Sequence, residues 1–382
     1  MRKIGFILIF FMMFCSLLSG YSLPESSASG ECVGAVTGKY TALGGSVIMG
    51  ENWTNPALLA RGSGFRIKVG AGLLKSGEKR KKSIFDVFDN RVGDITVADN
   101  NYVFLEPTYL SLSYTSNFHF ALGLNLLPVV NFDYRYSREV RDDFYVLVKS
   151  ILDEGKGSLY LGNVGVAYEF FREKISVGLG VNLYTGEKEW EYGEDYVDPS
   201  YADINEVFSR TLSGNGVIVG ISANPITRIR LGGFLSTKTN TGDYEEDYIP
   251  QRAGLGAAIT LPNRLPATFF VDAIFEGWNE ISDNYEDVLK LHLGIQHEFT
   301  SGFDGRFGFG YETSYLSKNV PRVFFTCGCG FEKAGYVFDT GIKLCKFSFR
   351  SDDISIEPRD MDGVTMVEES LIKLMFSIGY HR

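Results

Sequence analysis

The residues of this 382-residue chain that could carry chemistry are few and scattered. Its four histidines, His119, His292, His297 and His381, have no partner at a spacing that suits a metal site or a catalytic triad. The sequence contains no G-x-S-x-G, phosphate-binding loop, H-E-x-x-H or C-x-x-C motif. We therefore expect no catalytic residue, no metal site and no cofactor, and we interpret the protein as something other than an enzyme.

The five cysteines do not predict a disulfide framework. Cys327 and Cys329 lie two apart in an extended run, which puts them on one face but in a poor geometry for a bond to each other. Cys32 and Cys345 have no evident partner, and Cys15 lies in an apolar run at the N-terminus. The spacing leaves the role of the cysteines open.

Charged clusters lie in long polar segments of the chain. Acidic residues gather at 187–195 and 243–247, and a basic run occupies 79–82. The acids could hold divalent cations against anionic lipid, and the bases could contact lipid phosphates, but a solvated loop is the simpler interpretation of each. Residues 143–154 have helical spacing and predict a short helix in one of these segments.

The elements that would position these residues are β-strands. The chain is 45% hydrophobic and 14% aromatic, with a net charge of −10 and a mean hydropathy of −0.02. These values argue against a disordered chain, a nucleic-acid-binding protein and a bundle of membrane helices. From residue 64 onward apolar and polar residues alternate, for example over 118–126 and 175–183. The polar face repeatedly carries Gly, Ser, Asn, Lys or Arg, which suits a wet lumen.

Fourteen such runs are long enough for the roughly 9–11 tilted residues of a membrane strand. They are 64–74, 103–115, 118–132, 158–171, 174–188, 214–224, 226–238, 251–262, 266–278, 288–300, 305–316, 321–332, 335–350 and 369–381. Long polar segments alternate with tight links between them, as external loops alternate with periplasmic turns in outer-membrane barrels. The sequence therefore predicts an all-β fold, a transmembrane antiparallel β-barrel of about 14 strands over residues 64–382, in the cell outer membrane.

The N-terminal residues predict export. Arg2 and Lys3 precede an apolar run, Ile4–Leu18, which is too short to span a membrane and suits a secretory signal. We expect residues 1–22 to be a signal peptide, with cleavage between about residues 20 and 28. Residues 23–63 do not alternate, and we expect them to form a plug inside the lumen.

Residues 42–60, ALGGSVIMGENWTNPALLA, resemble the amino-terminal plug of the FadL family. Members of this family are outer-membrane transporters of long-chain fatty acids and other hydrophobic compounds. The family pattern is an A-x-G-G-A opening and an N-P-A-x-L-A element, and here the opening ends in Ser46. Residues 261–299 resemble the family more loosely. The family's 14-strand barrel agrees with the number of strands that alternation predicts.

The resemblance implies a binding role for the plug and a break in the barrel wall. The resemblance places Asn55, Pro56 and Ala57 in the plug near a ligand pocket. Trp53, Leu58 and Leu59 would give this pocket apolar surface inside a polar lumen. Pro128 interrupts the predicted third strand, where it removes a ladder hydrogen bond. FadL-like proteins have a lateral opening at a kink in this strand, so we expect Pro128 to mark such a gate. The alternatives are a simple turn at Asn55–Pro56 and an ordinary bulge at Pro128.

These features together predict passive outer-membrane transport of hydrophobic small molecules such as long-chain fatty acids. The expected partners are the hydrophobic ligand, outer-membrane lipid and the barrel-assembly machinery, with no nucleic acid. Two other functions stay open: a non-transporting FadL-like barrel that acts as a scaffold or shuttle for surface proteins, as PorV-like relatives do, and a polar porin. TraF-like proteins also share the N-P-A-L-L-A type of element.

Overall fold

A computed structural model gives the structure of residues 29–142, 144–170, 174–262, 266–300, 302–350, 353–354, 360–361 and 363–382. The predicted signal peptide, residues 1–22, and its cleavage site lie outside these described residues. No helix in the described ranges is long and apolar enough to cross a membrane.

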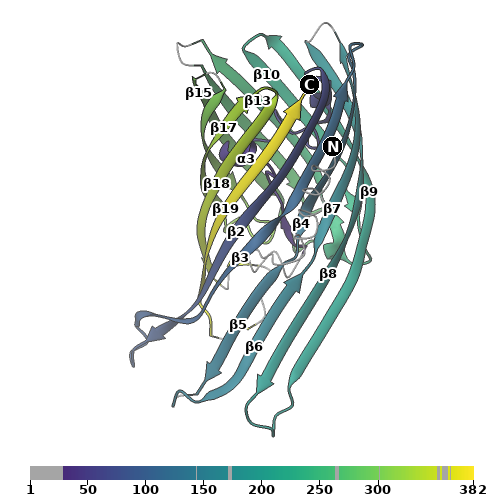
Figure 1. Cartoon of the computed structure of the whole chain (residues 1–382). Coiled ribbons are helices and arrows are strands. Elements are labelled where there is room, and N and C mark those ends of the chain that lie inside the picture. Colours follow the sequence, from purple (N-terminus) through teal and green to yellow (C-terminus); the bar gives the residue numbers. More distant parts are fainter. Residues whose placement is uncertain are drawn as a thin grey trace.

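Fourteen of the described strands close into one antiparallel barrel (Figure 1). Their bounds are β2 Gly64–Phe85, β3 Arg91–Thr115, β4 Phe120–Asn131, β7 Ser158–Phe170, β8 Ile175–Tyr196, β9 Ile204–Ile226, β10 Ile229–Ser236, β13 Gln251–Leu261, β14 Ala267–Gly277, β15 Val288–Thr300, β16 Phe303–Glu312, β17 Arg322–Lys333, β18 Tyr336–Arg350 and β19 Met366–His381. Neighbours in this order pair with one another, and β19 pairs with β2 to close the barrel. The predicted fold class is confirmed.

Each barrel strand has an apolar outer face and a buried inner face. On β19, Ile372, Phe376 and Ile378 are exposed on the outside, whereas Lys373 and Ser377 are buried. The exposed apolar side chains of all the strands form a belt around the barrel, as lipid contact requires. Closure pairs the backbone N–H and C=O groups at the strand edges, which would find no hydrogen-bond partner in the hydrocarbon of the membrane. The protein is a membrane-spanning barrel of the outer membrane.

Several strands, among them β2, β3, β8 and β9, extend well past the rest of the barrel at one end (Figure 1). The outer face of β8 passes from Leu183 through Thr185 to Glu187 and Glu189, so the distal part of this strand lies outside the hydrocarbon layer. A hairpin of β5 (Tyr134–Arg141) and β6 (Leu147–Lys156) extends this projecting sheet. Strand β6 pairs with the distal part of β8 over Lys149–Lys156.

This projecting sheet corrects two expectations from the sequence. The polar segments 75–102, 133–157 and 189–213 are largely strand, not loop. The helix predicted over 143–154 is wrong, because Leu147–Lys156 form β6. Outside the membrane no face of the sheet contacts hydrocarbon, and buried inner positions such as Glu78, Arg80 and Asn100 are polar, so the polarity alternation that identifies a strand fades there.

The described part of the N-terminal segment, residues 29–63, contacts the inner face of the barrel. It contains β1 (Glu31–Cys32), the helix α3 (Gly38–Ala42) and the 3-10 helix η1 (Pro56–Ala60). Helix α3 packs against β17, β18 and β19, and η1 packs against β7, β8 and β9. The remaining elements are β11 (Thr239–Asn240), η2 (Glu245–Asp247) and β12 (Tyr248–Ile249).

Candidate functional site

A cavity of about 100 Å³ lies between the N-terminal segment and the barrel wall. Strand β1 contributes Glu31 and Cys32 to its lining, and Trp53 and Thr54 come from the turn before η1. The wall contributes inward side chains of strands on both sides of the lumen. We call this space the luminal cavity.

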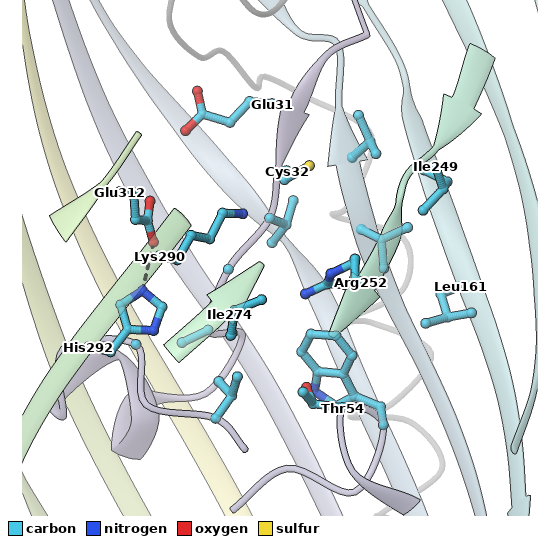
Figure 2. A pocket seen from close by; sticks show the side chains of 18 of the residues that line it. Glu31, Cys32, Thr54, Leu161, Ile249, Arg252, Ile274, Lys290, His292 and Glu312 are labelled. Atoms are coloured by element: carbon cyan, nitrogen blue, oxygen red, sulfur yellow. Dashed lines mark hydrogen bonds and ion pairs between the residues drawn. The ribbon is translucent and has the colours of Figure 1, made fainter. Parts of the chain in front are cut away.

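The luminal cavity has two chemically different sides (Figure 2). Lys290, His292 and Glu312 lie together on one side, from the neighbouring strands β15 and β16. Leu161 and Ile249 lie on the opposite side, and Arg252 stands between the two groups. The cavity therefore suits a molecule with an apolar body and a polar end.

The charged groups on the polar side are paired with one another. Glu276 accepts a hydrogen bond from Lys290 Nζ at 2.9 Å, and Arg252 Nε lies 3.3 Å from the same carboxylate. His292 Nε2 lies 2.9 Å from Glu312 Oε1. Pairing keeps these buried charges tolerable in the lumen, because an isolated buried charge would be costly. A ligand would meet a polar, hydrogen-bonding surface here.

Trp53, at the luminal cavity, has a buried hydrogen-bond donor without a described partner. The indole is 3% exposed and lines the cavity, and its Nε1 has no hydrogen-bond partner among the described residues. Thr54 Oγ1 and His292 Nδ1 are likewise buried at this cavity without a described partner. An unsatisfied buried donor costs about 1–3 kcal/mol, so an acceptor atom bound near Trp53 would be stabilised.

The Asn55–Pro56–Ala57 element attaches the N-terminal segment to the wall. Asn55 is fully buried, and its side-chain amide donates to the carbonyl of Ile221 in β9 at 3.1 Å. Its side-chain oxygen accepts from Ala57 N–H at 3.2 Å, which caps η1 with Pro56 as the first helical residue. These three residues do not line the luminal cavity.

The two leucines of the element occupy different places. Leu59 is fully buried and packs closely against Gly123 of β4 and Gly165 of β7. Leu58 lines a second cavity of about 300 Å³, which also contacts Glu51 and Lys68. Of the six predicted plug residues, the structure therefore places Trp53 at the luminal cavity, Leu58 at the second cavity and the other four in the attachment to the wall.

The wall changes its pairing at Pro128. The described ladder between β3 and β4 joins Leu110–Thr115 with Leu126–Ala121 and ends there. Beyond it, the edge of β4 pairs with β1 through Cys32↔Val130 and Glu31↔Asn131. On its other side, β4 stays paired with β7, with an irregularity between Pro128 and Val130. The N-terminal segment therefore occupies an edge of β4 that β3 has left.

Known structures with this architecture are similar to this chain over almost their whole length. A Pseudomonas aeruginosa FadL homologue matches with a TM-score of 0.65 at 13% identity, covering 92% of this chain and 99% of that one. The Ralstonia pickettii toluene transporter TbuX matches with a TM-score of 0.60 at 13% identity, covering 92% and 98%. The Pseudomonas putida toluene transporter TodX matches with a TM-score of 0.60 at 12% identity, covering 92% and 99%. No protein-family model and no curated protein sequence matches the chain.

The chain has the FadL-type fold. The resemblance that residues 42–60 carry is thus confirmed at the level of the fold. Within this FadL-type barrel, sequence reasoning missed the polar side of the luminal cavity, including Arg252, Lys290 and Glu312. Their signal was an ionisable side chain at an inward position of an alternating strand, but only the pairing of the strands shows which of these side chains come together.

Proposed function

We propose that this protein is a passive outer-membrane transporter of hydrophobic small molecules, with residues 29–63 as its plug. The observation that carries the proposal is the position of the change in wall pairing. Val129 and Val130 follow Pro128 on β4 and also line the luminal cavity. An apolar ligand in this cavity would therefore lie directly behind the part of β4 that is no longer paired with β3.

The proposed route ends in a sideways exit at Pro128. Val33 N–H donates to the carbonyl of Val129 at 2.9 Å, so a short stretch of the plug covers the edge of β4. If β1 leaves this edge, the cavity opens toward the bilayer between β3 and β4. The apolar ligand then passes into hydrocarbon without crossing water, which the hydrophobic effect favours.

The ligand class follows from the two sides of the cavity. The toluene transporters TbuX and TodX share the fold and support a hydrophobic ligand. A fatty acid would place its chain near Leu161 and its carboxylate near Arg252 and Lys290. The cavity of about 100 Å³ is smaller than the roughly 300–1,000 Å³ of common ligand pockets, so a long chain would need β1 to move aside. No chemical step is part of the proposal.

Uptake by cells tests this function. The protein is expressed in a host that lacks its own long-chain fatty acid transporter, and uptake of labelled oleate and toluene is measured. We expect both rates to exceed those of cells with an empty vector. A barrel that reaches the membrane without raising either rate would contradict transport and favour the scaffold function. Entry of small hydrophilic sugars instead would favour a polar porin.

A conservative variant at the cavity sharpens the test. Trp53→Phe keeps the apolar ring and removes the unused N–H donor, so we expect oleate binding to weaken about 2- to 10-fold. Toluene has no acceptor atom, and its binding should not change. Trp190→Phe is the matched control, because Trp190 donates to Asp153 in the projecting sheet, away from the cavity. Equal loss of oleate and toluene binding in Trp53→Phe would contradict the donor role.

A further inference from the structure

The outer surface of β18, β19 and β2 becomes basic directly past the apolar belt. The belt of exposed apolar residues ends at Leu344, Ile372 and Leu73 on these strands, and β2 exposes apolar residues again only at its far end, Ile84 and Phe85. The strands lie side by side in Figure 1, and their pairing puts Leu344, Ile372 and Lys75 in one cross-strand row. Lysine thus already replaces an apolar residue in the last row of the belt on β2.

The next rows add further lysines around a small polar floor. Lys346, Ser370 and Gly77 form the second row, and Ser348, Glu368 and Lys79 form the third. Gly77 is buried beneath the side chains of Ser370 and Asn101, which form a polar floor between the lysines. We call the surface formed by Lys75, Gly77, Lys79, Lys346 and Ser370 the basic rim patch.

The charges of the basic rim patch are only partly neutralised. Lys79 pairs with Asp99 of β3 at 2.8 Å, and Glu368 is engaged by Lys81 at 2.6 Å. Lys75 and Lys346 are exposed and make no ion pair with any residue that the structure describes. Glu368 lies close enough to attract Lys346 as well as Lys81, so Lys75 is the less neutralised of the two exposed cations.

Five strands away from β19 around the barrel, the outer face of β8 becomes acidic past its own apolar residues. Past Leu183, the outer face of β8 carries Thr185 and then Glu187 and Glu189. An anionic headgroup would be repelled there and attracted at the basic rim patch. The patch is therefore a local feature and not a general property of the rim.

We propose that the basic rim patch binds the phosphates of a diphosphorylated glycolipid in the outer leaflet. Outer-membrane barrels carry their long connections on the external side, which places the patch in that leaflet. The belt below Lys75 would hold the acyl chains, while Lys75 and Lys346, two strands apart, would each contact a phosphate. The hydroxyl of Ser370, which lies next to Gly77, would supply a further hydrogen bond to the headgroup, whereas the amide of Asn101 already donates to Asp99 at 2.8 Å.

Lipid titration of the purified full-length barrel in dodecyl maltoside tests this site. The probe is diphosphoryl lipid A, with phosphatidylglycerol as the comparison lipid. Lys75→Gln/Lys346→Gln should weaken lipid A binding about fivefold per lost cation, roughly 25-fold together. Lys156→Gln/Lys318→Gln is the charge-matched control on exposed lysines outside the patch, and its binding should not change. Lys75→Arg/Lys346→Arg should restore binding, and heat-modifiable migration confirms folding of each variant.

Two results would overturn the inference. Equal lipid A binding by the patch variant and by the control would show that the basic rim patch does not bind this lipid. Equal affinity of the native protein for phosphatidylglycerol and lipid A would overturn the assignment to a diphosphorylated lipid. Oleate uptake is measured in parallel and should be unchanged by the patch variant, so failure of this site is distinguishable from failure of the transport function.

Discussion

The side-chain amide of Asn55 donates a hydrogen bond to the carbonyl oxygen of Ile221, 3.1 Å away in the barrel wall. The close approach depends on glycines of the neighbouring strands. A Cβ at Gly220 would lie 2.2 Å from Asn55 Oδ1, and one at Gly232 would lie 3.0 Å from Asn55 Nδ2. Asn55 thus joins the N-terminal segment to β9 while its oxygen caps η1.

Two substitutions separate these two roles of Asn55. Asn55→Ala removes the cap and the hydrogen bond to β9. We therefore expect hydrogen exchange of residues 53–60 to become faster, because the free energy of local opening falls by about 1–3 kcal/mol. Asn55→Ser keeps a cap acceptor for Ala57 N–H but cannot reach the Ile221 carbonyl, so its effect should be intermediate. Wild-type exchange rates in Asn55→Ser would show that the bond to β9 contributes nothing.

A substitution at Gly178 of β8 tests how closely the N-terminal segment packs against the barrel wall. A Cβ at this position would lie 2.3 Å from the carbonyl carbon of Pro56 and 2.4 Å from the nitrogen of Ala57. Backbone atoms cannot yield as a flexible side chain does, so we expect Gly178→Ala to displace η1 from the wall. The variant should show faster proteolysis at residues 50–63 and a larger conductance in planar bilayers.

Gly193 on the same strand provides the matched control for this change. A Cβ there would meet only the carbonyl oxygen of Ile204, at an ordinary 3.7 Å. Gly193→Ala should therefore leave both proteolysis and conductance at the wild-type level. Wild-type behaviour of Gly178→Ala would contradict a close-packed attachment of the N-terminal segment.

Alternation located every barrel strand because the two faces of each strand meet different media. The run 118–126 on β4 has exposed Phe120, Leu122 and Leu124 outside and buried Asn125 inside. Past the belt neither face meets hydrocarbon, so the alternation predicts a strand that ends at residue 188, whereas β8 continues to Tyr196. Apolar residues in β6, such as Val148 and Ile151, then matched a helical spacing by coincidence.

The candidate site was predictable only in part. Trp53 lies in a recognisable local motif, and the structure places it at the luminal cavity. Arg252 and Glu276 face each other in the register of β13 and β14, so a hairpin alignment could have paired them. The pairing of Cys32 with Val130 had no local signal, because β1 is only two residues long and its partner is distant in sequence.

Glu194 lies in the projecting sheet outside the apolar belt, and its carboxyl group controls how the contact between β6 and β8 responds to acid. Burial raises the pKa of its carboxyl, but hydrogen bonds from Lys149, Tyr192 and Tyr196 outweigh this effect and hold the pKa at about 2. A lowered acid pKa contributes stability that is complete above the unfolded value near 4.5 and is lost as the pH falls through about 2. The contact should therefore persist at pH 4.

Pepsin cleavage of the β5–β6 hairpin measures this contact in the acid range. The native hairpin should resist cleavage at pH 3.5 and become sensitive near pH 2 as Glu194 protonates. Glu194→Gln cannot form the ion pair with Lys149 and should be sensitive at both pH values. Glu189→Gln, on the outer face of the same strand, should behave like the native protein. A hairpin equally sensitive at both pH values in the native protein would contradict this role of Glu194.

The pairing of Cys32 with Val130 allows the proposed gate to be locked. Val33 N–H bonds to the carbonyl of Val129 at the adjacent position, so Cys32 and Val130 form a non-hydrogen-bonded pair. The Cα atoms of such pairs are about 4.5 Å apart, within the range of a disulfide. Val130→Cys therefore places a second thiol opposite the native Cys32, in a background in which the three other described cysteines are changed to alanine.

Oxidation of this pair should fix β1 to the edge of β4 and block the sideways exit. We expect oleate uptake to fall to the level of cells without the protein after oxidation and to recover on addition of dithiothreitol. Val130→Ser in the same background controls for the change in side-chain size and should be insensitive to redox state. If the oxidised Val130→Cys variant forms the disulfide and still takes up oleate at the reduced rate, the ligand does not leave past β1, and an exit at Pro128 is excluded.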